Sequence, residues 1–200
     1  KSLKFFGIER KIDEEKIYNY IKNYKEKNFA LKLIVSDENF ILTSRKDNYR
    51  GENKSLSLKI SKVRRNSTSK IIYHKSLCYY ENILEHRWAV ESGYDSALFL
   101  NERDEVCETS FANIFFVRDH KIFTPEISSG LLRGTMREFL LENFEINEEK
   151  ICAKDLIGFD ECFISNSLMG VRNVMSIDEI KFTGRDKTRD IQEKLKIYGF

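Results

Sequence analysis

The sequence has very little proline and no apolar run long enough to cross a membrane. Its 200 residues include one proline and nine glycines, which excludes collagen-like and linker-rich proteins. No stretch approaches the roughly 20 apolar residues of a transmembrane helix, and no signal-peptide pattern opens the sequence. Position 1 is a lysine rather than a methionine, so we expect a chain that lacks its natural opening segment.

The charges nearly cancel, and the cysteines follow no recognisable metal-binding spacing. Lys and Arg number 34 against 32 Asp and Glu, for a formal net charge of +2, so we predict no nucleic-acid partner. The cysteines at 78, 107, 152 and 162 form no CxxC pair, and we expect reduced thiols in a cytoplasmic protein rather than a zinc site. Dinucleotide-binding, Walker A and serine-hydrolase motifs are absent too. The chain is nevertheless 41% apolar, enough for a sizeable core.

The first third of the chain predicts one helix and several strands. Apolar residues recur at helical spacing over residues 13–27 and alternate over 29–35, as in a half-buried strand. Residues 40–43 and 56–63 predict two further strands. The polar stretch 64–69 is the best candidate for a domain boundary. We therefore expect a small α/β domain over residues 1–66 and a larger domain over 67–200.

The remainder predicts a β-rich domain with three helices. An amphipathic helix is expected after Lys75, closed by Gly93, with one apolar face made of Leu77, Tyr80, Leu84 and Trp88. Strands are expected over 97–100, 106–108, 114–117, 121–124 and 161–165, with a hairpin turn at Asp119-His120. Helices are expected over 135–143 and 187–198. This mixture predicts a two-layer α+β fold rather than a regular βαβ alternation.

Three segments carry residue types that suit a cofactor site, although each also has an ordinary structural explanation. Lys75 follows the apolar run 71–73, and a lysine between a strand and a helix can point into a cleft, where burial makes its amine nucleophilic. Glu108 ends a predicted strand and could pair with a cationic ring nitrogen. Gly134 precedes a helix whose free N–H groups would bind phosphate, and the loop 166–170 adds a hydroxyl. The alternatives are a surface lysine, a turn carboxylate and a simple helix cap.

Taken in order, these segments resemble the class IV (fold-type IV) pyridoxal-phosphate enzymes. The matching residues are His-Lys-Ser-Leu at 74–77, Gly-Tyr-Asp-Ser-Ala-Leu-Phe-Leu-Asn at 93–101, Val-Cys-Glu-Thr-Ser at 106–110, Asn-Ile-Phe at 113–115, Ile-Phe-Thr-Pro at 122–125, Gly-Thr-Met-Arg at 134–137 and Asn-Ser-Leu-Met-Gly at 166–170. Ordered segments over about half the chain are far more specific than one motif. The resemblance implies a two-domain, D-amino-acid aminotransferase-like α+β fold with an incomplete N-terminal α/β lobe.

The resemblance also implies which residues would react with the cofactor, pyridoxal 5'-phosphate (PLP). Lys75 would hold PLP as a Schiff base and, once displaced by the substrate amine, would move protons at the substrate carbon. Glu108 would lie against the pyridine nitrogen and keep it protonated, so that the ring accepts electrons. Tyr79 would lie near the ring oxygen, a role for which Tyr80 is the alternative.

The phosphate of PLP is expected at two loops. By resemblance, Thr135 and Met136 would offer backbone N–H groups at the helix start, Ser167 a hydroxyl and Leu168 an N–H. The family also implies a homodimer that acts on a small-molecule amine, with no nucleic-acid or membrane partner. These features describe a cytoplasmic enzyme.

Two departures from the family pattern guide the expected activity. Aminotransferases usually have Gly-Ile-Thr-Arg where this chain has Gly-Thr-Met-Arg at 134–137, which removes a threonine hydroxyl from the phosphate site. That change and the Asn-Ser-Leu at 166–168 favour 4-amino-4-deoxychorismate lyase, which produces p-aminobenzoate and pyruvate for folate biosynthesis. A branched-chain or D-amino-acid aminotransferase is the alternative. The family's His-x-x-Arg-Leu pattern has no counterpart here, and an inactive truncated relative is the third possibility.

Overall fold

The computed structural model describes residues 1–26, 28–47 and 54–198 and divides the chain into two compact units. The first unit spans residues 1–52 and the second spans 53–200. This division lies earlier than the expected boundary between 1–66 and 67–200. The physical reason is that Leu56–Arg65 forms strand β3, which is paired on both sides within the sheet of the second unit.

The first unit contains a helix, a β-hairpin and a short helical turn. Its elements are α1 (Ser2–Phe5), α2 (Glu14–Asn23), β1 (Phe29–Val35) and β2 (Phe40–Lys46). The strands pair antiparallel, with Phe29 opposite Lys46 and Val35 opposite Phe40. Helix α2 begins where the side chain of Asp13 accepts a hydrogen bond from the backbone of Lys16, a typical N-cap. It ends earlier than the predicted 13–27, whose last residue lies outside the described residues.

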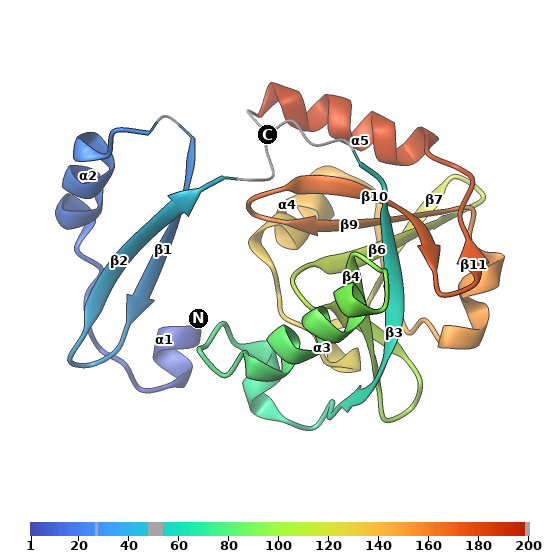
Figure 1. Cartoon of the computed structure of the whole chain (residues 1–200), viewed down its shortest axis with the longest axis horizontal. Helices are drawn as coiled ribbons and strands as arrows, with labels where there is room; N and C mark the ends of the chain where they lie inside the picture. Colours follow the sequence, from blue (N-terminus) through green and yellow to red (C-terminus); the bar gives the residue numbers. More distant parts are fainter. Residues whose placement is uncertain (27, 48–53, 199–200) are drawn as a thin grey trace. The chain divides into compact units, whose positions relative to one another are not determined.

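The second unit is built on one curled, mixed β-sheet (Figure 1). Among the described residues the sheet has nine strands: β3 (Leu56–Arg65), β4 (Ser96–Asn101), β5 (Val106–Thr109), β6 (Asn113–Arg118), β7 (Lys121–Pro125), β8 (Ile146–Glu149), β9 (Glu161–Asn166), β10 (Gly170–Ile177) and β11 (Ile180–Lys181). Their order is β5-β4-β3-β10-β9-β6-β7-β8, and β11 pairs with β10. The pairs β3–β4, β3–β10 and β7–β8 are parallel, and the others are antiparallel. The two ends approach one another, because Glu105 forms a bridge with Cys152 beyond β8.

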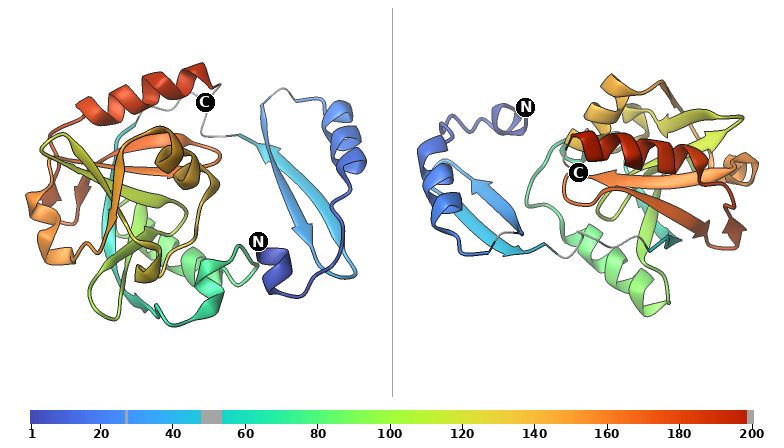
Figure 2. Two further views of the ribbon diagram at one scale, coloured as in Figure 1. Left: turned by 180° about the vertical axis from the view of Figure 1, so that it is seen from behind. Right: turned by 90° about the horizontal axis from the view of Figure 1, so that it is seen from above.

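In the described part of the second unit, three α-helices cover this sheet. They are α3 (Tyr80–Glu91), α4 (Thr135–Asn143) and α5 (Asp186–Ile197), with shorter 3-10 turns η1 (Lys70–Tyr73), η2 (Ile127–Ser129) and η3 (Ala153–Gly158). Helix α3 packs on β3 and β4, α4 packs on β9, and α5 packs on β9 and β10. Figure 2 shows α5 lying along the β9–β10 hairpin from two further directions. No helix among the described residues is long and apolar enough to span a bilayer.

The main core lies between the sheet and helices α4 and α5. Phe115 of β6 and Phe163 of β9 stack with ring centroids 4.8 Å apart. Met136 and Leu140 of α4 and Leu195 of α5 close the cluster from the helical side. Strand β4 is buried along its whole length, as expected for a strand covered on both faces. The α+β fold predicted from the sequence is confirmed.

Several local predictions were wrong or incomplete. The expected helix after Lys75 starts only at Tyr80, and its buried residues are Asn82 and Ala89, whereas Leu77, Tyr80 and Leu84 are exposed. The run 71–73 forms part of a 3-10 turn rather than a strand. Strands β8, β10 and β11 were not predicted. The Asp119-His120 turn is confirmed, since both residues have positive φ angles between β6 and β7.

Candidate active site

Lys75 lies in the segment that joins the 3-10 turn Lys70–Tyr73 to helix α3. Its side chain is exposed, so the structure does not show the burial expected from its position. The amine nevertheless has close neighbours. Nζ lies 5.3 Å from the ring centroid of Tyr79, and its positive charge lowers the pKa of Glu108. The Lys75 amine therefore lies beside the Tyr79 ring, and its charge acts on Glu108.

Glu108 is a nearly buried carboxylate near the end of β5, and its side chain is 13% exposed. Burial raises its pKa to about 7. Three groups oppose that shift: the guanidinium of Arg65 at 3.7 Å, the backbone N–H of Leu132 at 3.1 Å and the charge of Lys75. A carboxylate in such surroundings changes its charge near neutral pH and can pair with a cationic ring nitrogen.

Tyr79 is anchored to the backbone that follows β5. Its hydroxyl donates a hydrogen bond of 2.5 Å to the carbonyl of Ser110, which also accepts 3.0 Å from the side-chain amide of Asn82. These two bonds fix the start of α3 beside the chain segment that follows Glu108. Its neighbour Tyr80 is 67% exposed, so the geometry favours Tyr79 over Tyr80 as the aromatic residue of the site.

The start of α4 lies close to Glu108 through Asn113. The Asn113 amide donates to the carbonyl of Leu132 at 2.8 Å and approaches Glu108 at 3.5 Å. A Cβ at Gly134 would lie 2.2 Å from Asn113 Oδ1, so only glycine allows this approach. Gly134 caps α4 without a side-chain hydrogen bond, and the first N–H groups of such a helix attract anions.

The other predicted phosphate loop is the turn between β9 and β10. Ser167 and Leu168 are both exposed there. The side chain of Asn166 accepts the N–H of Leu168 at 2.9 Å, so this N–H already has a partner. Asn166 also donates to the carbonyl of Phe111 at 3.2 Å, which ties the turn to the segment after Glu108. At the helix start, Thr135 is exposed and Met136 is buried in the core.

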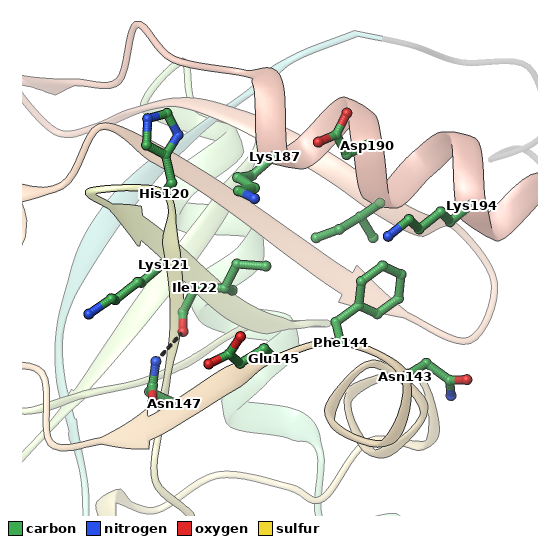
Figure 3. A pocket seen from close by; sticks show the side chains of 11 residues that line it. His120, Lys121, Ile122, Asn143, Phe144, Glu145, Asn147, Lys187, Asp190 and Lys194 are labelled. Carbon is green, nitrogen blue, oxygen red and sulfur yellow. Dashed lines mark hydrogen bonds between the residues drawn. The ribbon is translucent and has the colours of Figure 1, made fainter.

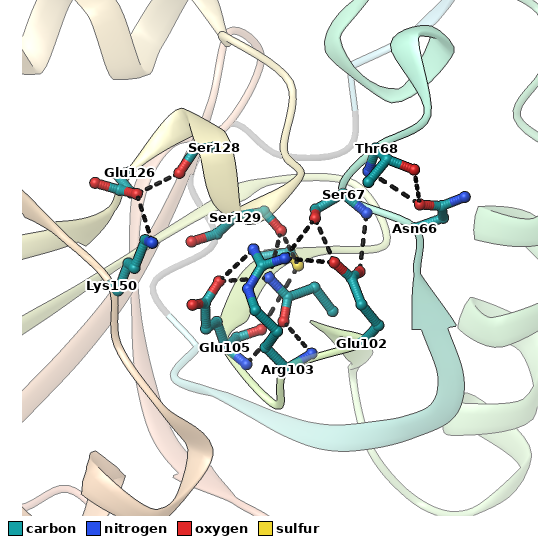
Figure 4. A network of polar contacts seen from close by, with 12 residues as sticks. Asn66, Ser67, Thr68, Glu102, Arg103, Glu105, Glu126, Ser128, Ser129 and Lys150 are labelled. Atoms are coloured by element: carbon teal, nitrogen blue, oxygen red, sulfur yellow. Dashed lines mark hydrogen bonds and ion pairs between the residues drawn. The ribbon is translucent and has the colours of Figure 1, made fainter.

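A network of polar contacts holds the loop that leads to Lys75 (Figure 4). The backbone N–H and hydroxyl of Ser67 both donate to Glu102, and Arg103 donates to the Ser67 hydroxyl at 2.9 Å and to Glu105 at 2.8 Å. The hydroxyl of Tyr73 donates to the carbonyl of Ser67 at 2.5 Å. Because Tyr73 lies only two residues before Lys75, the network fixes where the lysine enters the site.

Sequence reasoning missed the residues that connect the predicted ones. Arg65, Asn82, Asn113 and Asn166 each bridge two segments of the site. The one available signal for Arg65 was the pair of adjacent arginines at the end of a predicted strand. Asn113 and Asn166 stood in the matching family segments, but nothing local showed which groups they bond, and for Asn82 there was no signal.

A cavity of about 260 Å³ lies elsewhere in the second unit, between β7, β8, the end of α4 and α5 (Figure 3). The amide of Asn147 donates to the carbonyl of Ile122 within it. Its other lining residues are His120, Lys121, Asn143, Phe144, Glu145, Lys187, Asp190, Ile191 and Lys194. No residue of the candidate active site lines it, so this cavity is separate.

Comparison with known proteins identifies the family. The family model for amino-transferase class IV matches residues 1–177, and the chain belongs to this family of PLP-dependent enzymes. It is 28% identical over 198 residues to a "Probable branched-chain-amino-acid aminotransferase" of Aquifex aeolicus, covering 94% of this chain and 63% of the relative. It is 31% identical over 131 residues to an aminodeoxychorismate lyase of Vibrio harveyi, covering 61% of this chain and 48% of the relative.

Solved structures show the same fold. A "Putative 4-amino-4-deoxychorismate lyase" of Legionella pneumophila matches with a TM-score of 0.83 and 25% identity, over 98% of this chain and 81% of that one. A branched-chain aminotransferase of Thermobaculum terrenum in its PLP-form matches with a TM-score of 0.80 and 21% identity, over 98% of this chain and 73% of that one. The resemblance read from the sequence motifs is confirmed at the level of the family.

Proposed function

We propose that this protein is a PLP-dependent 4-amino-4-deoxychorismate lyase, which releases p-aminobenzoate and pyruvate. The observation that carries the proposal is the nearly buried carboxylate of Glu108, whose pKa the positive charge of the Lys75 amine lowers. PLP chemistry requires two groups of a protein. One is an amine that can form a covalent bond with the cofactor, and the other is a carboxylate that can hold the ring nitrogen.

The residues present fit PLP. The α4 N-terminus supplies N–H groups without a side-chain cap, which suit a phosphate, and Gly134 leaves room for the Asn113 side chain beside Glu108. Glu108 and Asn113 face the same region and suit the ring nitrogen and its surroundings. When bound, PLP supplies an electron sink for the bonds around the substrate carbon.

The chain's own residues would then have separate tasks. The Lys75 amine would hold the cofactor aldehyde and would move the proton at the substrate ring. Glu108 would pair with the pyridine nitrogen and favour its protonated form. The N–H groups of Thr135 and Met136 and the hydroxyl of Ser167 bind the phosphate, and Tyr79 lines the ring. Leu168 contributes less than expected from the sequence, because its N–H bonds Asn166.

The lyase is preferred over an aminotransferase because of the phosphate site. The Met136 side chain packs into the core beside Phe115 and Leu140, so this position offers only its backbone N–H. The Asn-Ser-Leu-Met turn at 166–169 resembles the lyases too. A branched-chain or D-amino-acid aminotransferase is the second candidate, favoured by the Aquifex relative that matches 94% of this chain.

The products distinguish the candidates. Purified protein with PLP and 4-amino-4-deoxychorismate should release p-aminobenzoate and pyruvate in equal amounts. In a parallel reaction with 2-oxoglutarate and branched-chain or D-amino acids, glutamate should stay at the level of a Lys75→Ala control. Glutamate formation that depends on Lys75 would support the aminotransferase instead. Neither product, together with no visible absorbance of bound PLP, would indicate an inactive relative.

We also propose that the enzyme is a homodimer of the cytoplasm. The exposed Leu77, Tyr80 and Leu84 near the start of α3 provide apolar surface of the kind that a second copy would cover. Light scattering after size-exclusion chromatography should give twice the chain mass of 23.7 kDa. The mass of a single chain at micromolar concentration would refute the dimer.

A further inference from the structure

Arg65 is a buried arginine at the last position of β3, and its side chain is 8% exposed. One of its terminal nitrogens lies 3.7 Å from Glu108 and donates a 2.8 Å hydrogen bond to the side-chain oxygen of Asn82. The other lies 3.4 Å from Glu81. Within the part of the chain that the structure describes, its Nε has no hydrogen-bond partner. An arginine is rarely buried unless its charge is paired and hydrogen-bonded.

The guanidinium is fixed in place by its surroundings. Its central carbon lies 4.0 Å from the ring centroid of Phe99, a stacking geometry that suits the planar guanidinium of arginine. Asn82 in turn donates to the carbonyl of Ser110, the same carbonyl that holds Tyr79. Arg65 therefore reaches Glu108 from a rigid frame that also positions the start of α3.

The structure assigns Arg65 as a positioning residue that keeps Glu108 ionised and aimed at the cofactor ring nitrogen. This inference rests on the proposed PLP site. It adds a residue that does not itself touch the cofactor or the substrate, but acts through the carboxylate that does.

The charges around Glu108 show why a permanent cation is needed. Desolvation drives the carboxyl towards its neutral form, and Arg65, the Leu132 N–H and Lys75 oppose that effect. Glu81 of α3 lies against Arg65. Lys75 is expected to change its bonding during the reaction, so its charge is not constant. An arginine stays protonated at any physiological pH, and a neutral Glu108 would not hold a proton on a pyridine nitrogen.

Two neighbouring arginines give a matched pair of variants. Arg65→Met removes the charge and keeps a long apolar side chain over Phe99. Arg64→Met removes the adjacent charge, which is 40% exposed and pairs with Asp104 instead. Arg65→Gln is a second variant that removes the charge but keeps a polar group within reach of Asn82. Arg65→Lys restores the charge without the planar guanidinium.

The readout is the titration of the Glu108 carboxyl in cofactor-free protein, followed by carbon NMR with labelled glutamate and assigned with Glu108→Gln. We expect an apparent pKa of about 7 in the natural sequence and in Arg64→Met. In folded Arg65→Met or Arg65→Gln the pKa should rise by about one unit or more, and Arg65→Lys should recover part of that rise. An unchanged pKa in whichever charge-removing variant folds would overturn the inference.

A separate measurement tests the underlying site. PLP should give the natural sequence a visible absorbance band, and the pH at which that band changes should move in the same direction as the Glu108 pKa in Arg65→Met. Failure of the natural sequence to bind PLP would refute the proposed function, while the NMR titration would still decide whether Arg65 controls Glu108. If the pH dependence of the absorbance band is the same in Arg65→Met as in the natural sequence, the inference about Arg65 is overturned and the proposed PLP site is not.

Discussion

Replacing Glu108 by glutamine should make the stability of the second unit less sensitive to pH. The pKa of Glu108 is about 7 in the folded protein, against an ordinary value of 4.5. Below about pH 4 both the folded and the unfolded chain hold this proton, so burying the side chain carries no ionic penalty. Between the unfolded pKa of 4.5 and the folded pKa of about 7, the unfolded chain loses the proton first. The free energy of unfolding therefore falls as pH rises. At 1.36 kcal/mol per unit, the loss is about 3 kcal/mol.

Urea unfolding followed by tryptophan fluorescence measures this effect. The single tryptophan, Trp88, lies on α3 of the same unit as Glu108, so its signal reports the relevant unit. The stability of Glu108→Gln minus that of the natural sequence should rise by about 3 kcal/mol from about pH 4 to about pH 8. Glu81→Gln removes a carboxylate that is 53% exposed and serves as the control. If the stability difference between Glu108→Gln and the natural sequence stays constant or falls with pH, the raised pKa of the buried Glu108 carboxyl is refuted.

Two further predictions follow from close packing. Gly134→Ala would place a Cβ 2.2 Å from Asn113, so it should cost roughly 1–3 kcal/mol and lower the melting temperature by about 2–4 °C per kcal/mol. Gly158→Ala has open space and should be neutral or slightly stabilising; equal melting temperatures for the two variants would contradict the close approach. Burial raises the pKa of the Cys107 thiol, so iodoacetamide in mild alkali should label exposed Cys78 far faster than Cys107, and equal rates would show that Cys107 is accessible.

The sequence predicted local elements better than it predicted what they pack against. The alternation of Phe29–Val35 and the Asp119-His120 turn are local signals, and both elements are observed. Strand β10 was missed because Gly170–Ile177 has no regular alternation and is buried over most of its length between β3 and β9. The apolar residues at the start of α3 were expected on one face, yet that helix buries Asn82 and Ala89. The buried Asn82 bonds Arg65 and the carbonyl of Ser110, and helical periodicity cannot reveal such bonds.

For the candidate site, ordered motifs located the segments but not their connections. Lys75, Glu108 and Tyr79 were named from the sequence, and in the structure the Lys75 amine lies beside the Tyr79 ring and its charge acts on Glu108. Their roles stay predictions. Arg65 was grouped with the polar domain boundary, since nothing local shows that its side chain turns inward to Glu108. A contact between residues so far apart in sequence is defined by the pairing of β3 with β4 and of β4 with β5, which only the folded sheet supplies.

The most direct test is to ask which lysine PLP binds. The protein is incubated with PLP, reduced with borohydride, digested and analysed by mass spectrometry, alongside Lys75→Ala and the nearby exposed Lys70→Ala. A single pyridoxyl group on the peptide that contains Lys75, retained in Lys70→Ala and lost in Lys75→Ala, is the predicted result. Labelling spread over surface lysines, or labelling that persists in Lys75→Ala, would contradict the assignment of the site.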